Sequence, residues 1–337
     1  MLGLARYSRH LAIAAGLATT IGAFASVTGV LAQGKKPLAP VTLRLDWKPG
    51  AQHAPFYFAK AKGYYAAEGF DVTIIPGSGS SDSVKLLGAH SVDLALVDAL
   101  VLVQAAEQDV PAKAVAAYYQ RTPIVLISPA DKPIDNPKQL LGDIKLGAKK
   151  GSATYQGLLA FLAASNIKPE QIHLNDVGFG VQPLLVHQVD GLMGFIMNEP
   201  IEAESGGMKV HNLLIADHGV HAYGLTIATN DRFMKDHPDQ LKAFLRATIK
   251  AMREASADQK GAVDALTAAV SDIDAAHESK VLDQTVPFWT GDDTRSHGIG
   301  WQTDAQWQQT IDTAKLLGLV DTPPKSSSVY SNAFVAE

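Results

Sequence analysis

The sequence contains no cysteine among its 337 residues. This absence excludes disulfide bonds, thiolate metal sites and cysteine nucleophiles, and it also excludes a lipid anchor attached to a cysteine after a signal peptide. Positive charge is scarce as well, because 29 Lys and Arg residues stand against 34 Asp and Glu residues and give a net charge of −5. Since the chain lacks a basic excess, nucleic acid is not an expected partner.

Long uncharged apolar runs are absent except near the N-terminus. Arg6, Arg9 and His10 precede residues 11–30, which carry no charge and are typical of a secretory signal peptide. Small side chains around Ala32 predict a signal peptide of residues 1–32; a membrane-spanning helix is the alternative, although the run is rich in small residues and a cleavage motif follows it. Loss of Arg6 and Arg9 takes the net charge from −5 to −7. We expect a freely soluble, monomeric, periplasmic protein.

Strand-length apolar segments alternate with segments of helical period. In the first third they are residues 41–45, 55–66, 72–75, 83–87 and 94–97, with two further strands at 114–119 and 124–128. Prolines 129, 133 and 137 mark a break, and the alternation then repeats at 144–147, 154–165, 174–177, 183–189 and 192–196. This order predicts two α/β units with parallel strands.

The C-terminal third has a different pattern. Apolar residues recur at helical spacing on one face, at Leu241, Phe244, Leu245, Ile249 and Met252. The spacing predicts that the chain from Arg232 onward is mainly helical. Earlier in the chain, Gly63 and Asn166 are expected to end helices, because both residue types tolerate left-handed backbone.

Three segments of the sequence resemble a known family. They are LRLDWKPGAQHAPFYFAKAKGYYAAEGFDV (43–72), VDLALVDA (92–99) and KLGAKKGSATY (145–155). They are similar to the periplasmic solute-binding proteins of ABC importers for thiamine-pyrimidine precursors, nitrate, sulfonates and taurine. The resemblance covers residues 41–250, and its most specific motif is Asp46-Trp47 followed by His53. The Asp-Trp start is more similar to the thiamine-pyrimidine branch.

The resemblance implies an α/β protein of the type II periplasmic binding protein fold. In that fold two α/β lobes are joined by two crossing segments, and a ligand binds in the cleft between them. On this chain, lobe 1 is expected to comprise residues 33–128 and 230–337 and lobe 2 residues 129–229, with crossings near 127–132 and 226–230. The implied partners are a small-molecule ligand and an ABC transporter permease in the inner membrane, with no cofactor.

Three candidate ligand residues stand near the start of the first unit. Trp47 follows the first predicted strand, so it should lie at the carboxyl end of the sheet, where ligands of open α/β sheets bind. Its ring is a candidate stacking surface for a flat heteroaromatic ring, with a core or rim tryptophan as the alternative. Gln52 and His53 open the first helix and should face the same crevice, although His53 could instead cap or pack.

Two further segments follow predicted strands of the first unit. Residues 77–81, Gly-Ser-Gly-Ser-Ser, offer N–H groups that can donate to an anion or a ring carbonyl. They depart from the dinucleotide-binding fingerprint because Asp82 stands where that motif needs Gly or Ala, and a cap by Ser81 or Asp82 is the alternative. Asp98 directly follows the third strand, and its carboxylate either caps the next helix or reaches the crevice.

The second unit offers matching candidates. Ser152 begins a helix and can donate a hydrogen bond, and Tyr155 one turn later is a candidate lid. Glu199 follows a strand, and its carboxylate can accept two hydrogens from an aminopyrimidine-like ring or pair with an ammonium. Its alternative role is a favourable acidic position in the first turn of a helix. Tyr118, next to Tyr119, is a candidate for the same wall.

The combined hypothesis is a planar ring held between two aromatic side chains. Trp47 and Tyr155 are the aromatic residues, and the carboxylates of Asp98 and Glu199 accept hydrogen bonds from the ring. Gln52, His53 and Ser152 supply neutral hydrogen bonds. The two carboxylates argue against nitrate or sulfonate, which need cationic or N–H donors. His218 and His221 lack a third ligand at a known spacing, so no metal is expected.

An enzyme of the same fold is the main rival to a binding protein. Fungal thiamine-pyrimidine synthase resembles the first half of the chain, but Val97 and Val101 stand where it has the pyridoxal-phosphate lysine and the sacrificial histidine. Its cysteine-rich motif has no counterpart, and no Gly-x-Ser-x-Gly elbow or base beside Ser152 supports a hydrolase. We therefore expect no enzyme activity. Two alternatives stay open: the same fold binding a sulfonate, nitrate or other small solute, and a sensor or scavenger without a transporter.

Overall fold

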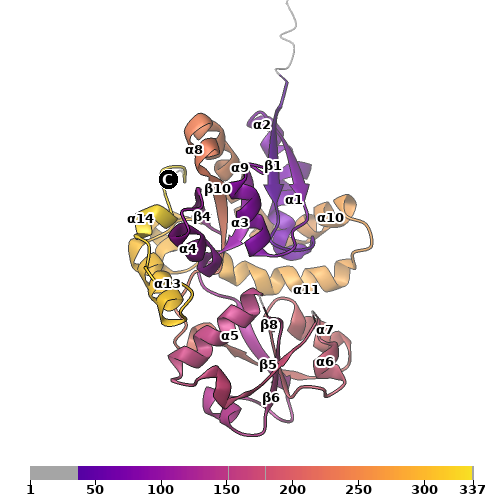
Figure 1. Ribbon diagram of the computed structural model, residues 1–337. Coiled ribbons are helices and arrows are strands. Elements are labelled where there is room, and N and C mark those ends of the chain that lie inside the picture. Colours follow the sequence, from indigo (N-terminus) through magenta and orange to yellow (C-terminus); the bar gives the residue numbers. More distant parts are fainter. Residues whose placement is uncertain (1–36, 151, 179, 336–337) are drawn as a thin grey trace, which may run out of the picture. The chain divides into compact units, whose positions relative to one another are not determined.

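The computed structural model of the protein describes residues 37–150, 152–178 and 180–335, and the predicted signal peptide lies outside them. The chain from Pro37 onward forms two five-stranded sheets. We call the part built on the first sheet lobe 1 and the part built on the second sheet lobe 2 (Figure 1). The predicted alternation of strands and helices is confirmed in both.

The lobe 1 sheet has the strand order β2-β1-β3-β10-β4. Its strands are β1 (Ala39–Arg44), β2 (Phe70–Ile75), β3 (Leu94–Asp98), β4 (Ala112–Ala117) and β10 (Leu225–Asn230). β1 pairs in parallel with β2 and β3, whereas β10 is antiparallel to β3 and β4. β10 therefore enters the sheet from lobe 2 against the direction of its neighbours.

The lobe 2 sheet repeats this plan with the order β7-β6-β8-β5-β9. Its strands are β5 (Ile124–Pro129), β6 (Lys145–Ala148), β7 (His173–Asp176), β8 (Gly191–Phe195) and β9 (Val210–Leu214). β6 is parallel to β7 and β8, and β5 is antiparallel to β8 and β9. Each lobe thus contains one strand, β10 or β5, that follows directly from the other lobe.

Sheet pairing moves both crossings toward the N-terminus. The segment 124–128 was expected to complete the first sheet, but as β5 it lies within the second sheet. The chain therefore crosses between β4 and β5, at residues 118–123, and again between η4 (Ile215–His218) and β10, at residues 219–224. Both positions precede the predicted crossings at 127–132 and 226–230, because a buried apolar strand does not reveal which sheet it joins.

The helices confirm the patterns read from the sequence. α9 (Pro238–Ala257) buries the predicted apolar face, and Gly63 (φ +71°) and Asn166 (φ +57°) adopt the left-handed backbone expected after helices. The other helices are α1 (Ala54–Ala61), α2 (Tyr64–Ala67), α3 (Ser80–Gly88), α4 (Ala99–Glu107), α5 (Ala153–Ala164), α6 (Gln182–Leu185), α7 (Glu199–Ser205), α8 (Asp231–Asp236), α10 (Gln259–Ala269), α11 (Ala275–Thr285), α12 (Asp292–His297), α13 (Asp304–Leu316) and α14 (Ser326–Val329). The short 3-10 turns include η1 (Ala51–His53), η2 (Pro137–Leu141), η3 (Pro169–Gln171) and η5 (Val286–Trp289).

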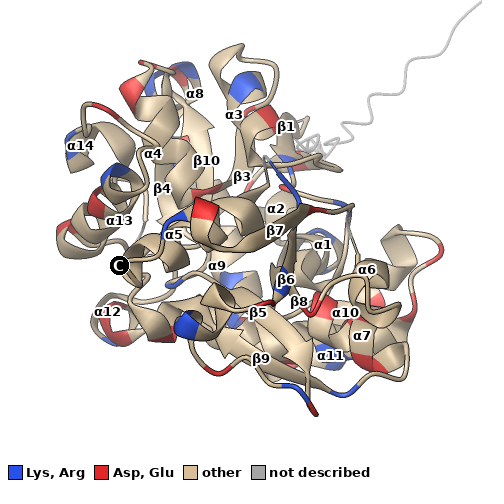
Figure 2. Ribbon diagram, turned by 60° about the horizontal axis from the view of Figure 1, so that its bottom comes forward, with Lys and Arg blue, Asp and Glu red and all other residues tan. Residues whose placement is uncertain are grey.

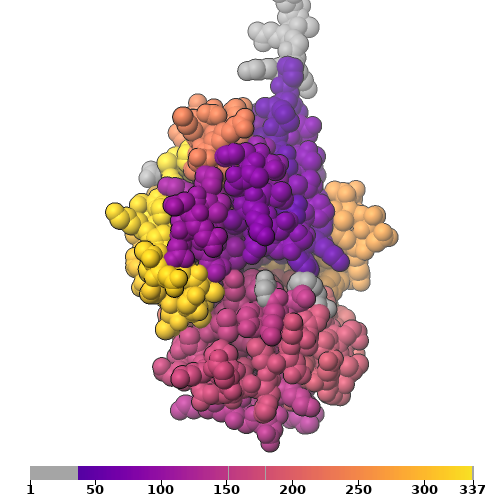
Figure 3. All heavy atoms as spheres, viewed as in Figure 1, coloured from indigo at the N-terminus to yellow at the C-terminus, as the bar shows by residue number. Residues whose placement is uncertain are grey.

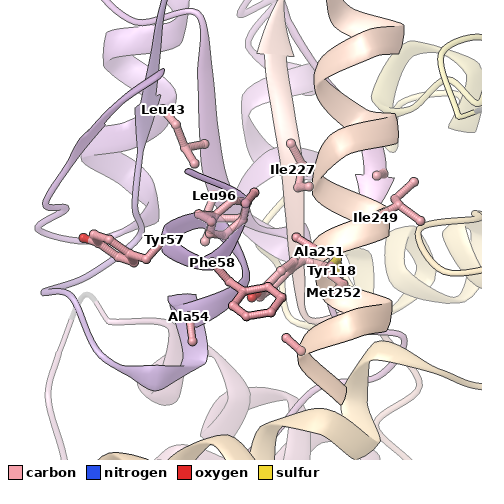
Figure 4. Close-up of a cluster of buried hydrophobic side chains, with 14 of the residues drawn as sticks. Leu43, Ala54, Tyr57, Phe58, Leu96, Tyr118, Ile227, Ile249, Ala251 and Met252 are labelled. Carbon is pink, nitrogen blue, oxygen red and sulfur yellow. The ribbon is translucent and has the colours of Figure 1, made fainter. Parts of the chain in front are cut away.

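The core of lobe 1 packs the first sheet against α1 and the C-terminal helices (Figure 4). In that cluster the ring of Tyr65 stacks on Phe244 with 5.1 Å between centroids, and its hydroxyl lies 2.9 Å from Thr248 Oγ1. α13 contacts both α4 of lobe 1 and α5 of lobe 2, as the yellow segment of Figure 3 illustrates. The C-terminal helices therefore belong mainly to lobe 1 and also touch lobe 2.

The surface carries both signs of charge. Figure 2 shows Lys and Arg scattered among Asp and Glu over the ribbon. Within the described residues, no helix combines the length and the apolar character needed to cross a membrane.

Candidate functional site

The segment after β1 carries the Asp-Trp motif, and the loop after β2 braces it. The N–H of Gly77 donates to the Trp47 carbonyl (2.9 Å), and the N–H of Gly79 donates to the Asp46 carbonyl (2.8 Å). A Cβ on Gly77 would lie 2.0 Å from the carbonyl oxygen of Leu45, so only glycine permits this approach. Trp47 itself is half-buried.

The first helix begins with a buried turn that includes two predicted site residues. His53 is 0 % exposed, and its Nε2 donates to the carboxylate of Asp46 at 2.8 Å. Its other ring nitrogen, Nδ1, makes no hydrogen bond to a described residue. Gln52 is also buried, and its carbonyl accepts a hydrogen bond from the hydroxyl of Tyr118 at 2.6 Å. The structure thus brings His53 to Asp46 and Gln52 to Tyr118.

Tyr118 lies behind this turn. It is fully buried, its ring stacks on Phe56 with 5.4 Å between centroids, and it belongs to the cluster of Figure 4. Burial raises the pKa of its hydroxyl well above the usual value. Tyr118, predicted to line the ligand wall, is instead buried in the core and supports the turn through Gln52.

Asp98 ends β3 and caps α4. Its Oδ1 accepts the N–H of Leu100 at 3.0 Å, and its own N–H donates to Ser80 Oγ at 2.9 Å. The residue is only 4 % exposed, and burial raises the pKa of its carboxyl to about 7, with the nearby charge of Asp46 adding to the effect. Of the two roles open for Asp98, the structure shows the cap.

The loop at 77–81 uses its polar groups within lobe 1. Asp82 pairs with Arg44 and accepts a hydrogen bond from Ser78 Oγ at 2.8 Å, and these contacts, led by Ser78, hold the pKa of Asp82 below its usual value. The N-terminal cap of α3 is Gly79. Ser81 and Asp82, given as alternative caps, therefore do not cap that helix. Because Asp82 already engages Arg44 and Ser78, these two side chains are less available to an anionic ligand.

In lobe 2, Ser152 caps α5. Its Oγ accepts the N–H of Tyr155 at 3.2 Å and donates to the carbonyl of Lys149 at 2.7 Å. Tyr155 is half-buried against the lobe 2 core. On the same helix, Gln156 Nε2 donates to Gln104 Oε1 of α4 at 3.3 Å, which joins the two lobes beside these residues.

Glu199 begins α7, after a three-residue connection from β8. Its Oε2 accepts the N–H of Phe195 at 2.7 Å, and a Cβ on Gly194 would lie 2.8 Å from that oxygen, so Gly194 provides the space for the side chain. Burial raises the pKa of the Glu199 carboxyl to about 7, and Glu202 adds a smaller effect. The residue as a whole is half-buried, whereas Asp98 is buried.

α7 also contacts lobe 1. Met197 and Ile201 are buried in the lobe 1 cluster, and α7 touches α11. The candidate residues of both lobes follow the carboxyl ends of parallel strands, where open α/β sheets bind ligands. Two polar residues outside the predicted site contact the turn of Gln52 and His53: Asp46, which accepts from His53, and Glu278, whose carboxylate accepts the N–H of Ala51.

Other candidates lie elsewhere. The ring of His218 packs edge-on against Phe161, and no group of three His, Asp or Glu residues within the described ranges is arranged to hold a metal. A polar depression of about 150 Å³ lies near the start of β3 and the end of β10, lined by His90, Asp93, Asn230, Arg232, Phe233 and His237. It contains none of the predicted ligand residues.

The fold defines the class. The periplasmic aliphatic sulphonate-binding protein SsuA of Escherichia coli superposes with a TM-score of 0.68 at 16 % identity, covering 89 % of this chain and 94 % of that one. The protein therefore has the periplasmic binding protein fold. Its sequence matches the model of the NMT1/THI5-like family over residues 50–262, more than half of the chain, and the chain belongs to that family.

Relatives of this chain include binding proteins and enzymes. The riboflavin-binding protein RibY of Chloroflexus aurantiacus is 28 % identical, over 92 % of this chain and 90 % of that protein. The formylaminopyrimidine-binding protein of Halalkalibacterium halodurans is also 28 % identical, over 65 % and 67 %. A 4-amino-5-hydroxymethyl-2-methylpyrimidine phosphate synthase of Saccharomyces cerevisiae is 24 % identical, over the same shares of each chain.

Proposed function

We propose that this protein is the periplasmic solute-binding component of an ABC importer and binds a planar heteroaromatic ligand between its lobes. Trp47 of lobe 1 and Tyr155 of lobe 2 face the ring. The carboxylates of Glu199 and Asp98 accept hydrogen bonds from its N–H groups. Gln52, His53 and Ser152 supply neutral hydrogen bonds. The protein undergoes no covalent step, and its partner is the inner-membrane permease.

The observation that carries this proposal is the pair of carboxyls, one from each lobe. Burial raises the pKa of both Asp98 and Glu199 to about 7, and among the described residues no Lys, Arg or His is a cause of either shift. Asp98 and Glu199 each accept a backbone N–H, from Leu100 and Phe195, and a carboxylate can accept further hydrogen bonds. A ligand with ring N–H or amino groups can supply these, whereas a sulfonate or nitrate adds a second negative charge.

Names of relatives support the same ligand class. The relatives described as binding riboflavin or formylaminopyrimidine take flat nitrogen heterocycles. The synthase relatives supply the rival function, but Val97, at the position expected for the cofactor lysine, is 0 % exposed within β3. Valine has no amine that could bond to the cofactor, which favours a binding protein over a synthase.

The test is native mass spectrometry of the mature protein purified without added ligand, followed by thermal-shift titration. The panel comprises an aminopyrimidine thiamine precursor, riboflavin, taurine and nitrate. A co-purified heteroaromatic mass or saturable stabilisation by one heterocycle is the expected result, since a ligand that binds only the native state stabilises it. Stabilisation by taurine or nitrate alone would reject the roles of Asp98 and Glu199.

A further inference from the structure

The turn that opens the first helix is held at three consecutive residues by three separate elements. The N–H of Ala51 donates to Glu278 of α11, the carbonyl of Gln52 accepts from the hydroxyl of Tyr118 at 2.6 Å, and the ring of His53 donates to Asp46 at 2.8 Å. The turn is buried throughout, so each of these polar groups needs its partner.

Glu278 differs from the other two partners by its position in the chain. Asp46 lies next to the turn in sequence and Tyr118 lies at the first crossing, whereas Glu278 is 227 residues away from Ala51. α11 contacts both η1, which contains Gln52 and His53, and α7, which begins with Glu199. One helix therefore touches a proposed ligand segment of each lobe.

The contact is more than a favourable charge at the start of a helix. A first-turn glutamate can point to solvent and still interact with the helix dipole. Glu278 is instead half-buried, burial raises the pKa of its carboxyl, and the acid faces the amide of Ala51. Its geometry fixes the backbone from which Gln52 and His53 project.

We propose that Glu278 is a positioning residue of the ligand site, and that through it α11 holds the 50–53 turn in register with Glu199 on α7. This inference rests on the proposed function, because the turn is assigned to the site by that proposal. The C-terminal helices thereby gain a role in binding beyond completing the core of lobe 1.

The experiment compares Glu278→Ala, Glu278→Gln and Glu254→Ala in the full mature chain. Gln keeps an oxygen that can accept from Ala51, whereas Ala removes it. Glu254 is the matched control, since it accepts the hydroxyl of Tyr64 in the same lobe but lies on α9, away from the turn. Affinity for riboflavin and for an aminopyrimidine is measured by calorimetry, and hydrogen exchange follows the amides of residues 51–53.

Glu278→Ala should weaken binding by about tenfold, the scale of a lost charged hydrogen bond, and should speed exchange at residues 51–53. Glu278→Gln should stay within about threefold of the parent. Glu254→Ala should change neither the affinity nor the exchange at residues 51–53. This holds even if it lowers the unfolding temperature as much as Glu278→Ala does.

Wild-type affinity and exchange in Glu278→Ala would overturn the inference. Parallel losses of affinity in Glu278→Ala and Glu254→Ala would also overturn it, since they would report general destabilisation. If the parent protein binds neither probe, the proposed function fails on its own, and hydrogen exchange still decides whether Glu278 holds the turn.

Discussion

In lobe 1, the carboxylate of Asp98 accepts the N–H of Leu100 two residues later and thereby caps α4. In lobe 2, the carboxylate of Glu199 accepts the N–H of Phe195 four residues earlier and rests over Gly194. Both follow a parallel strand, and burial raises the pKa of both to about 7. Asp98 is buried, however, whereas Glu199 is half-buried.

This difference separates two tasks that the sequence presents alike. An acid placed after a strand can stabilise the helix that follows it, or it can bind a ligand. Asp98 is committed mainly to the first task and Glu199 retains surface for the second. We therefore expect the lobe 2 acid to dominate affinity and the lobe 1 acid to dominate stability.

The largest effect should come from Glu199→Gln. Loss of a charge-assisted hydrogen bond should weaken binding of the recognised heterocycle by up to about 100-fold, and Asp98→Asn should weaken it by only about threefold. Calorimetric titration of both variants measures this. Equal losses in the two variants would remove the distinction between the lobes.

The aromatic residues allow a second comparison. Trp47→Ala should weaken binding by about 10- to 100-fold through lost burial and stacking, and Tyr155→Ala should weaken it less because the smaller ring covers less of the ligand. Quenching of tryptophan fluorescence by the ligand gives the affinity of the parent and of Tyr155→Ala. Calorimetry gives the affinity of both variants. Unchanged affinity in Trp47→Ala would exclude Trp47 from the site.

Binding should depend on pH. A ligand that donates to the ionised acids binds more weakly once they are protonated, so affinity should fall about tenfold from pH 8 to pH 6 for one group with a pKa near 7. Glu199→Gln should lose most of this dependence. Titrations at several pH values measure it, and an affinity that rises as pH falls would show that the ligand meets protonated acids.

The pH dependence of the free protein has the same origin and a defined sign. In the unfolded chain these acids ionise near their ordinary values, whereas in the native state they keep their protons up to about pH 7. The native state therefore holds more protons between about pH 4 and 7, and this contribution to stability falls as pH rises through that window.

The smallest effect concerns the cap. Asp98→Ala should lower the free energy of unfolding by about 1 kcal/mol, partly offset by the removal of a buried acid, while Asp98→Asn should retain most of the cap. Urea denaturation of the ligand-free protein compares the two variants at one pH. Equal stability of the alanine and asparagine variants would show that the cap contributes nothing measurable.

Local sequence patterns predict much of the fold. Strand and helix alternation, the buried face of α9 and the left-handed residues Gly63 and Asn166 follow from short-range spacing and backbone preference. Sheet membership does not, because the apolar run of β5 suits either sheet and only its long-range pairing with β8 and β9 decides. The crossings were misplaced for that reason.

The candidate site shows the same limit. The Asp-Trp motif was visible, but the contact between Asp46 and His53 depends on how the turn folds back. Tyr118 looked available beside a strand end, yet Phe56 and Trp289 surround it in the core. Glu278 gave no local signal, because its partner Ala51 is 227 residues away.

One planar ligand should contact both lobes of the protein. The decisive measurement is a crystal structure of the mature protein with the heterocycle that stabilises it. We expect a ring between Trp47 and Tyr155, with a donor within hydrogen-bonding distance of Glu199. A ligand bound instead in the polar depression lined by His90 and His237, or one contacting a single lobe, would contradict it.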